Sequence, residues 1–268
     1  MSDELHSRHG LAPGAVEAFR SSGFIHLSNV LPPRVLERYE TEITARVVEL
    51  TTTHLPLEER STYDRAFLQV MNLWCESEIV RELVFSQRLA RLAADLLGTQ
   101  GVRLYHDQAL YKEPGGGITP WHADQYYWPF SSPATCTAWI PLQETPLELG
   151  PLSFALGSHK VDLGRSLGIS DESEREIQDA LAAHGFEHVE EPYALGDVSF
   201  HYGWTFHRAG ANRSDRPRGV LTVIYMDADI VVEEPTNGAQ RHDLDTWLRG
   251  ARVGGVPDGP LNPLAWAP

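Results

Sequence analysis

Apolar residues in the N-terminal part of the chain recur at helical spacing. One run repeats every four residues, at Val35, Tyr39, Ile43 and Val47. This spacing predicts an amphipathic helix, and the proline pair before it suits a first helical turn. A leucine-rich run after Ser86 predicts a second helix that ends at Gly98. The start of the chain predicts a short helix over residues 13–22 and a strand over residues 24–27.

From Gly101 onward the pattern changes to short β-type segments separated by glycine and proline turns. The predicted strands cover residues 102–111, 121–124, 135–142, 152–156, 198–206 and 220–226. This spacing is typical of an antiparallel sandwich or barrel, and the lack of βαβ alternation argues against a Rossmann-type sheet. We therefore predict a mainly β fold with flanking helices.

One helical segment, within residues 162–190, interrupts the β-type pattern. Ser170 is suited to cap a helix, acidic residues fill the first turn after it, and Gly185 can end the helix. A helical insertion in a β core is either a lid over a site or a surface decoration, and the sequence leaves both interpretations open.

Length and composition agree with one globular domain. The 268 residues are 42% hydrophobic and 22% charged, which excludes wholesale disorder. Sandwiches and barrels of about 200–250 residues are routinely single domains. We predict one domain over residues 1–268, with a mostly helical N-terminal support (1–100), a β-barrel core that carries the helical insertion (101–230) and a C-terminal extension (231–268).

The charge balance excludes some classes of partner. The formal charge is −15, from 22 Lys and Arg against 37 Asp and Glu. Nucleic acids and anionic membranes require clustered basic residues, so we expect neither and expect a small-molecule substrate. The polar opening is unlike a secretory signal, and Cys75 and Cys136 stand among apolar residues, so we predict buried, reduced thiols and a cytoplasmic protein. No feature assigns an oligomeric state.

Candidate chemistry begins after a glycine turn, at His122 and Asp124. On a strand, side chains two positions apart point the same way, so this imidazole and this carboxylate can meet at one point. Alone the pair is weak evidence, because a solvated strand end has the same pattern. His207, at the end of a later β-type segment, adds a second histidine. Two histidines and one carboxylate form the facial triad that binds non-haem Fe(II) and leaves positions open, whereas a structural zinc site closes with a fourth ligand, usually cysteine.

An arginine completes this pattern. Arg218 opens the apolar segment 219–225, and a hairpin would return it alongside His207. If 2-oxoglutarate chelates iron through its 2-oxo acid end, its distal carboxylate needs such a partner. Three other arginines compete for this role: Arg208, Arg213 and Arg216. We expect Arg213 and Arg216 to be solvated, because they stand in a turn.

Three segments stand in a joint order and spacing that is more specific than any one of them. They are His122-x-Asp124, the residues 150–160, and His207-x-x-x-x-Asn212-x-Ser214-x-x-x-Arg218. Over roughly residues 15–230 the chain thereby resembles the phytanoyl-CoA dioxygenase family, whose members depend on Fe(II) and 2-oxoglutarate.

The resemblance implies a double-stranded β-helix, which is a jelly-roll or cupin-like barrel, and the cofactors Fe(II), 2-oxoglutarate and O2. It carries over His122, Asp124 and His207 as iron ligands and Arg218 as the 2-oxoglutarate anchor. Asp124 distinguishes the chain from the halogenating relatives, in which a small residue frees a position for halide.

Other residues are candidates for the walls of the site. Gln108 either hydrogen-bonds the 2-oxoglutarate carboxylate or lies on the outer face, while Lys112, four residues on, is expected to be exposed. Trp139 either walls the co-substrate or packs in the core. The candidates for substrate binding are three aromatic residues after the iron motif and one histidine: Tyr126, Tyr127, Trp128 and His159. For each of them a purely structural role is the alternative.

The remaining histidines receive no ligand role. His201, six residues before His207, is interpreted as a neutral or exposed histidine. Four others show no partner spacing and are predicted at the surface: His6, His9, His54 and His242.

We therefore expect a dioxygenase of secondary metabolism that hydroxylates or otherwise oxidises a C–H bond of a small organic metabolite, releasing succinate and CO2. Two alternatives stay open. One is a cupin-like isomerase or hydrolase that uses zinc or manganese without 2-oxoglutarate. The other is a non-catalytic ligand-binding jelly roll.

Overall fold

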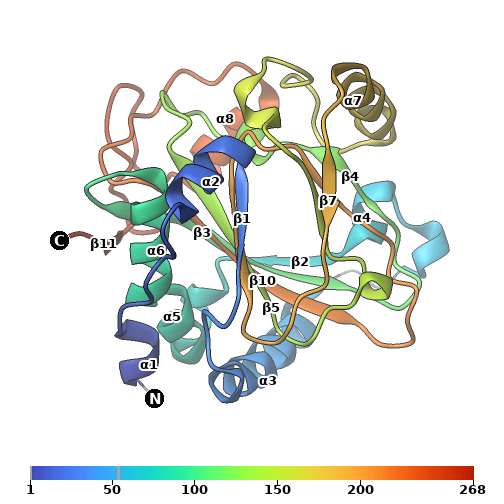
Figure 1. Ribbon diagram of the computed structural model, residues 1–268, viewed down its shortest axis with the longest axis horizontal. Helices are drawn as coiled ribbons and strands as arrows, with labels where there is room; N and C mark the ends of the chain where they lie inside the picture. Colours follow the sequence, from blue (N-terminus) through green and yellow to red (C-terminus); the bar gives the residue numbers. More distant parts are fainter. Residues whose placement is uncertain (1, 53–54) are drawn as a thin grey trace.

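Two antiparallel sheets face each other across the centre of the molecule (Figure 1). The computed structural model describes residues 2–52 and 55–268, so the prediction for His54 lies outside the described residues. The larger sheet has the order β1 (Phe24–Leu27), β8 (Val198–Tyr202), β5 (Thr135–Pro141), β10 (Arg218–Asp227), β3 (Val102–Lys112) and β11 (Leu264–Trp266), and β2 (Leu68–Met71) also pairs with β3. The smaller sheet has the order β4 (Thr119–His122), β9 (His207–Ala209), β6 (Leu152–Ala155) and β7 (His188–Glu190). The arrangement is a jelly roll, as predicted.

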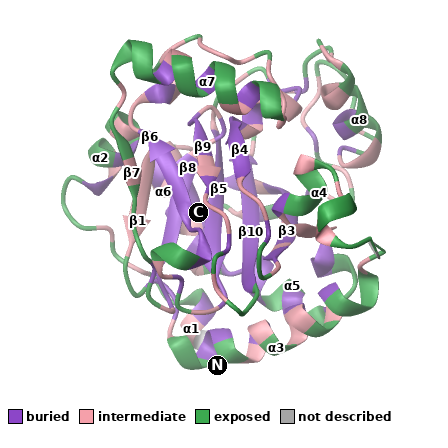
Figure 2. Cartoon of the chain, turned by 90° about the vertical axis from the view of Figure 1, so that its right-hand side faces the viewer, coloured by how far each residue is buried: buried purple, intermediate pink, exposed green. Residues whose placement is uncertain are grey.

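Helices from the first hundred residues cover the outside of the larger sheet. The helices of the described chain are α1 (Ser2–His6), α2 (Ala15–Ser22), α3 (Pro33–Leu50), α4 (Thr62–Ala66), α5 (Glu78–Val84), α6 (Gln87–Leu97), α7 (Asp171–His184) and α8 (Gly238–Thr246). The predicted apolar stripe of α3 is buried in the main hydrophobic core, together with the leucines of α6 and the outward-facing side chains of β3 and β10. Figure 2 shows this division, with buried strands between helices whose outer faces are exposed.

Local sequence signals set the helix ends. The Ser86 hydroxyl accepts a hydrogen bond from the Leu89 N–H at the start of α6, and Gly98 ends the helix in the left-handed conformation with φ 75°. At α7, Ser170 and Ser173 form a capping box. The predicted boundaries of these helices agree with the structure because the caps satisfy backbone groups that the helix leaves unpaired.

Several boundaries differ from the sequence prediction. The strand expected over 121–124 ends at His122, and Asp124 begins a 3-10 helix, η3 (Asp124–Tyr127). The segment 198–206 divides into β8 and a turn before β9. The sequence did not predict three strands, β2, β7 and β11, or four helices of the described chain, α1, α4, α5 and α8. The regions outside residues 101–230 thus supply both helices and strands to the fold.

The expected hairpin between His207 and Arg218 is wrong. Strand β9 pairs with β4 and β6 in the smaller sheet, whereas β10 pairs with β3 and β5 in the larger one. The connection therefore crosses from one sheet to the other, as expected in a jelly roll but not in a hairpin. His207 and Arg218 consequently approach the same interior from opposite sides.

The insertion packs on the smaller sheet. Ile177 and Leu181 of α7 are buried against Trp121 and Phe206, so the helix is fixed to the fold by an apolar contact. The segment before α7 brings Ile169 to the wall of the central cavity. A role of the insertion as a lid stays a prediction.

The cysteine prediction was half wrong. Both thiols are free, and Cys136 is buried, but Cys75 is exposed at the end of a short 3-10 helix. Its apolar neighbours Leu73 and Trp74 point into the core, and the chain turns away directly after them.

No helix of the described chain has the length and hydropathy needed to cross a membrane.

Candidate metal centre and substrate cavity

A cavity of about 290 Å³ lies between the two sheets. The larger sheet contributes Gln108 from β3, Trp139 from β5 and Arg218 from β10, and the smaller sheet contributes His122 from β4 and His207 from β9. The predicted site residues on these five strands are thus brought to one cavity.

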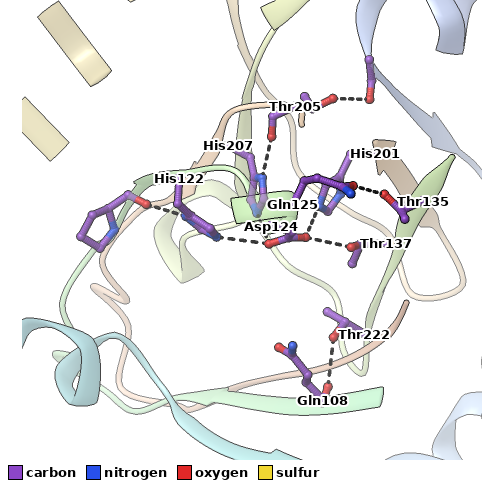
Figure 3. A network of polar contacts seen from close by, with 12 residues as sticks. Gln108, His122, Asp124, Gln125, Thr135, Thr137, His201, Thr205, His207 and Thr222 are labelled. Atoms are coloured by element: carbon purple, nitrogen blue, oxygen red, sulfur yellow. Dashed lines mark hydrogen bonds and ion pairs between the residues drawn. The ribbon is translucent and has the colours of Figure 1, made fainter. Parts of the chain in front are cut away.

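His122, Asp124 and His207 converge at the edge of this cavity (Figure 3). One donor atom from each lies within 4.8 Å of the others, and Asp124 Oδ1 is 3.6 Å from the Nε2 atoms of both His122 and His207. His122 lies directly opposite His207 in the β4–β9 pairing, which sets the two rings side by side. The turn into η3 then directs Asp124 back toward them.

Backbone carbonyls fix both imidazoles in the form that binds a metal. His122 Nδ1 lies 2.7 Å from the Pro120 carbonyl oxygen, and His207 Nδ1 lies 3.0 Å from that of Thr205. Because a carbonyl only accepts, each Nδ1 carries the proton and each Nε2 has a free lone pair. Burial, with a smaller contribution from neighbouring histidines, lowers the pKa of both His122 and His207 to about 4. Both rings are therefore neutral and able to coordinate a cation at neutral pH.

The other oxygen of Asp124 is held from behind. Asp124 Oδ2 accepts a hydrogen bond from the Thr137 hydroxyl at 2.8 Å and lies 3.2 Å from His201 Nε2. Burial acts to raise the pKa of Asp124, but the histidines around it outweigh burial and hold that pKa well below its usual range. The carboxylate is thus ionised, with Oδ1 left toward the two imidazoles. His201 is buried, so of the two predicted descriptions, neutral or exposed, the structure excludes exposure.

Arg218 is the charged group at the other side of the cavity. It is 2% exposed, and Nη1 donates to the Gly150 carbonyl oxygen at 2.6 Å, while Nε has no hydrogen-bond partner. Burial lowers its pKa to about 10, so the guanidinium stays charged at neutral pH. A buried cation with an unused donor is suited to an anionic ligand. Of the competing arginines, Arg213 and Arg216 are exposed and Arg208 pairs with Glu174 at 2.7 Å.

Lys112 is buried, which corrects the expectation that it is exposed. It lies opposite Arg218 in the β3–β10 pairing. Its ammonium group donates to the Gly117 carbonyl oxygen and lies 3.3 Å from the Thr119 hydroxyl. Burial and, secondarily, Arg218 lower its pKa well below the usual value. Lys112 is not part of the cavity wall, so it stabilises the glycine turn rather than the site.

The remaining predicted residues divide into two groups. The first group lines the cavity and consists of Gln108, Trp139, Tyr127 and Trp128. The Arg218 guanidinium lies over the ring of Trp139, with Cζ 5.5 Å from the ring centroid. The second group, Tyr126 and His159, does not line the cavity. The Tyr126 ring lies edge-on against Tyr127, and His159 stacks on Tyr202, on the far side of β8 from the metal cluster.

Sequence reasoning missed several cavity residues, which are Tyr63, Phe67, His106, Asp243 and Trp247. His106 shares the period-two face of β3 with Gln108, a signal that the alternation along the strand contains. Tyr63 and Phe67 lie around α4, and Asp243 and Trp247 lie at α8, two elements with no strong periodic pattern. Three histidines were predicted at the surface within the described residues. His6 and His242 are exposed, as predicted, and His242 also borders the cavity, whereas His9 is partly buried.

Comparison with known proteins agrees with this geometry. The family model for phytanoyl-CoA dioxygenase (PhyH) matches residues 19–220. The chain belongs to the phytanoyl-CoA dioxygenase family. The metal cluster and Arg218 all lie within the matched range, as the motif order predicts. No curated protein sequence matches the chain.

Solved structures extend the family comparison beyond the matched range. The non-heme alpha ketoglutarate dependent epimerase SnoN from nogalamycin biosynthesis, solved in complex with Fe3+, alpha ketoglutarate and nogalamycin RO, is 29% identical, with a TM-score of 0.78 over 94% of this chain and 97% of its own. The carbocyclase SnoK from the same biosynthesis is 28% identical, with a TM-score of 0.77 over 95% and 96%. EctD from S. alaskensis, solved with 2-oxoglutarate and 5-hydroxyectoine, is 19% identical and has the same fold, with a TM-score of 0.73 over 94% and 90%. The predicted double-stranded β-helix of this family is confirmed.

Proposed function

We propose that this protein is an Fe(II)- and 2-oxoglutarate-dependent oxygenase. One observation carries the proposal: a neutral His122–His207 pair and an ionised Asp124 share a cavity with the buried cation Arg218. Two imidazoles and one carboxylate suit Fe(II) and leave coordination positions for a bidentate co-substrate and dioxygen. Within residues 2–52 and 55–268 the cluster has three donors and no cysteine, unlike a closed structural zinc site.

Each residue has a distinct task in this proposal. His122 Nε2, Asp124 Oδ1 and His207 Nε2 hold the iron, and Arg218 binds the distal carboxylate of 2-oxoglutarate with Trp139 beside it. Iron and 2-oxoglutarate together activate O2, with succinate and CO2 as the co-products. The protein binds and orients the substrate and excludes water, and the apolar walls around Trp128 and Ile169 serve that purpose.

We infer a secondary metabolite as substrate, because the similar structures SnoN and SnoK come from nogalamycin biosynthesis. The reaction oxidises a C–H bond of that metabolite, with hydroxylation as the simplest outcome. Epimerisation and ring formation, the activities in the names of SnoN and SnoK, are the other two outcomes that a product analysis must distinguish.

Two measurements test the proposal. Fe(II) added anaerobically with 2-oxoglutarate gives a weak visible charge-transfer band, and a metabolite panel supplied with both gives oxygen uptake and succinate. His122→Ala, Asp124→Ala and His207→Ala abolish both signals while the fold survives. His159→Ala, a histidine outside the cavity wall, is the matched control and retains them.

The alternatives give different results. An isomerase or hydrolase turns over with zinc or manganese and without 2-oxoglutarate. A non-catalytic binding protein gives the band but no succinate with any metabolite. Full succinate formation by any of the three ligand variants would contradict the proposed iron site.

A further inference from the structure

The outer end of the cavity contains a buried carboxylate that the proposed iron chemistry does not use. Asp243, in the middle of α8, is 7% exposed and lines the cavity. The paired strands β3 and β10 run from one end of the cavity to the other. Arg218 pairs with Lys112 at one end, and Ile224 pairs with His106 toward the other end, which is the end of Asp243. The cavity thus has a cation at one end and an acid at the other.

A bulge in β3 builds this end of the cavity. The register shifts between Ile224 and Tyr225, so that His106 and Leu104 have partners on β10 and Tyr105 has none. A bulge turns the extra side chain toward the face of its neighbour. Tyr105 accordingly packs with Leu244 and Leu248 around α8, and its hydroxyl donates to Asp243 Oδ2.

Asp243 has no cationic partner. Tyr105 is its one side-chain hydrogen-bond partner in the described chain, and no Lys, Arg or His of residues 2–52 and 55–268 forms an ion pair with it. The only Lys or Arg among the residues described as lining the cavity is Arg218, at the far end. A buried carboxylate requires a compensating charge or a proton, and burial indeed raises the pKa of Asp243 to about 7.

Aromatic side chains line the cavity together with this carboxylate. Trp247 lies one helical turn after Asp243, on the same face of α8, and lines the cavity with Tyr63 and Tyr127. Ring faces together with a carboxylate are the chemistry that recognises an organic ammonium ion.

We propose that the outer end of the cavity binds a substrate group that carries a protonated or quaternary amine, through Asp243 and the rings of Tyr63, Tyr127 and Trp247. The inference rests on the proposed function, since it takes this cavity as the substrate pocket. The substrate class is then an amine-bearing secondary metabolite, held with its cation away from the iron and its reacting C–H bond toward it.

Choline and its uncharged isostere 3,3-dimethylbutan-1-ol test the proposal on the full chain. Binding is followed by tryptophan fluorescence, because Trp128 and Trp247 line the cavity. Choline is expected to bind at least about tenfold more tightly than the alcohol, and Asp243→Asn to remove this preference. The matched control is Asp245→Asn, an exposed acid on the same helix, which keeps the preference. Trp247→Leu removes a ring without removing charge and is expected to weaken choline binding severalfold.

Three results would overturn the proposal. They are the absence of choline binding, equal binding of choline and the alcohol by the wild-type protein, and a preference for choline that survives in Asp243→Asn. Tighter binding of the alcohol would instead identify Asp243 as a neutral hydrogen-bond donor. Neither titration needs iron or 2-oxoglutarate, so the choline result tests the ammonium site independently of the iron site. A wild-type protein without the visible iron band would contradict the proposed function and not the ammonium site.

Discussion

His201 Nε2 lies 3.2 Å from Asp124 Oδ2, the carboxylate oxygen that Thr137 also contacts. Since a carboxylate only accepts, His201 donates through Nε2. The contact leaves Oδ1 as the oxygen that faces His122 and His207. His201 therefore orients a metal ligand without being one.

Removing this contact is expected to weaken iron binding. His201→Leu keeps the volume of the side chain but loses the donor, and loss of such an orienting partner typically lowers metal affinity by about 10–100-fold. The measurement is an anaerobic Fe(II) titration followed by the 2-oxoglutarate band. His201→Gln retains an N–H donor and is expected to recover part of the affinity. Equal affinity in the wild type and in His201→Leu would exclude the orienting role.

Arg218→Ala is expected to raise the KM for 2-oxoglutarate by about 30-fold or more, because losing a buried charged hydrogen bond costs about 2–5 kcal/mol. Steady-state succinate formation at varied 2-oxoglutarate measures the effect. The matched control is Arg216→Ala, which removes an exposed arginine of the preceding turn and leaves the KM unchanged. An unaltered KM in Arg218→Ala would assign the co-substrate carboxylate to another residue.

Gly150 supports Arg218 through its backbone. Its carbonyl accepts the Arg218 Nη1 hydrogen bond, its φ is +68°, and an added Cβ would lie 2.3 Å from the Gly210 carbonyl oxygen. Gly150→Ala is therefore expected to lower the free energy of unfolding by about 2 kcal/mol or more and to weaken 2-oxoglutarate binding as well. Urea unfolding and the 2-oxoglutarate titration check the two effects. Gly238→Ala, where no atom lies within 4 Å of the added Cβ, is the control and keeps both values.

Acid is expected to destabilise the metal-free protein through its buried histidines. Burial lowers the pKa of His106 from 6.5 to about 3. Between these values the unfolded chain binds a proton that the folded chain does not, so stability is complete above pH 6.5 and is lost as the pH falls toward 3. At pH 5 the loss from His106 alone is about 2 kcal/mol.

The test compares urea unfolding of the metal-free protein at pH 7 and pH 5. In His106→Gln the difference between the two pH values is expected to shrink by that amount, whatever the absolute stability of the variant. His184→Gln, at an exposed position on α7, leaves the difference unchanged. An unchanged difference between the two pH values in His106→Gln would contradict the burial of a neutral His106.

The sequence alone determined the features that depend on neighbours along the chain. The apolar stripe of α3 and the caps of α6 and α7 follow from local spacing and local hydrogen bonds. The period of two along β3 named Gln108 as a candidate but left open whether its face is the interior or the outer one. The residues of the metal cluster were named too, through the joint spacing of His122, Asp124 and His207 that resembles the family matched over residues 19–220. The expected position of Asp124 on a strand was wrong, because the turn into η3 directs its side chain.

Tertiary structure decided what depends on which strands become neighbours. The crossing of β9 and β10 into different sheets places His207 and Arg218 on opposite walls, and spacing in the sequence could not distinguish this from a hairpin. Burial of Lys112 depends on the turn that folds over it. The carboxylate of Asp243 meets Tyr105 at the bulge of β3, which joins α8 to the larger sheet at the wall of the cavity. The Tyr105–Asp243 contact joins residues 138 positions apart, and no local pattern records a partner at that distance.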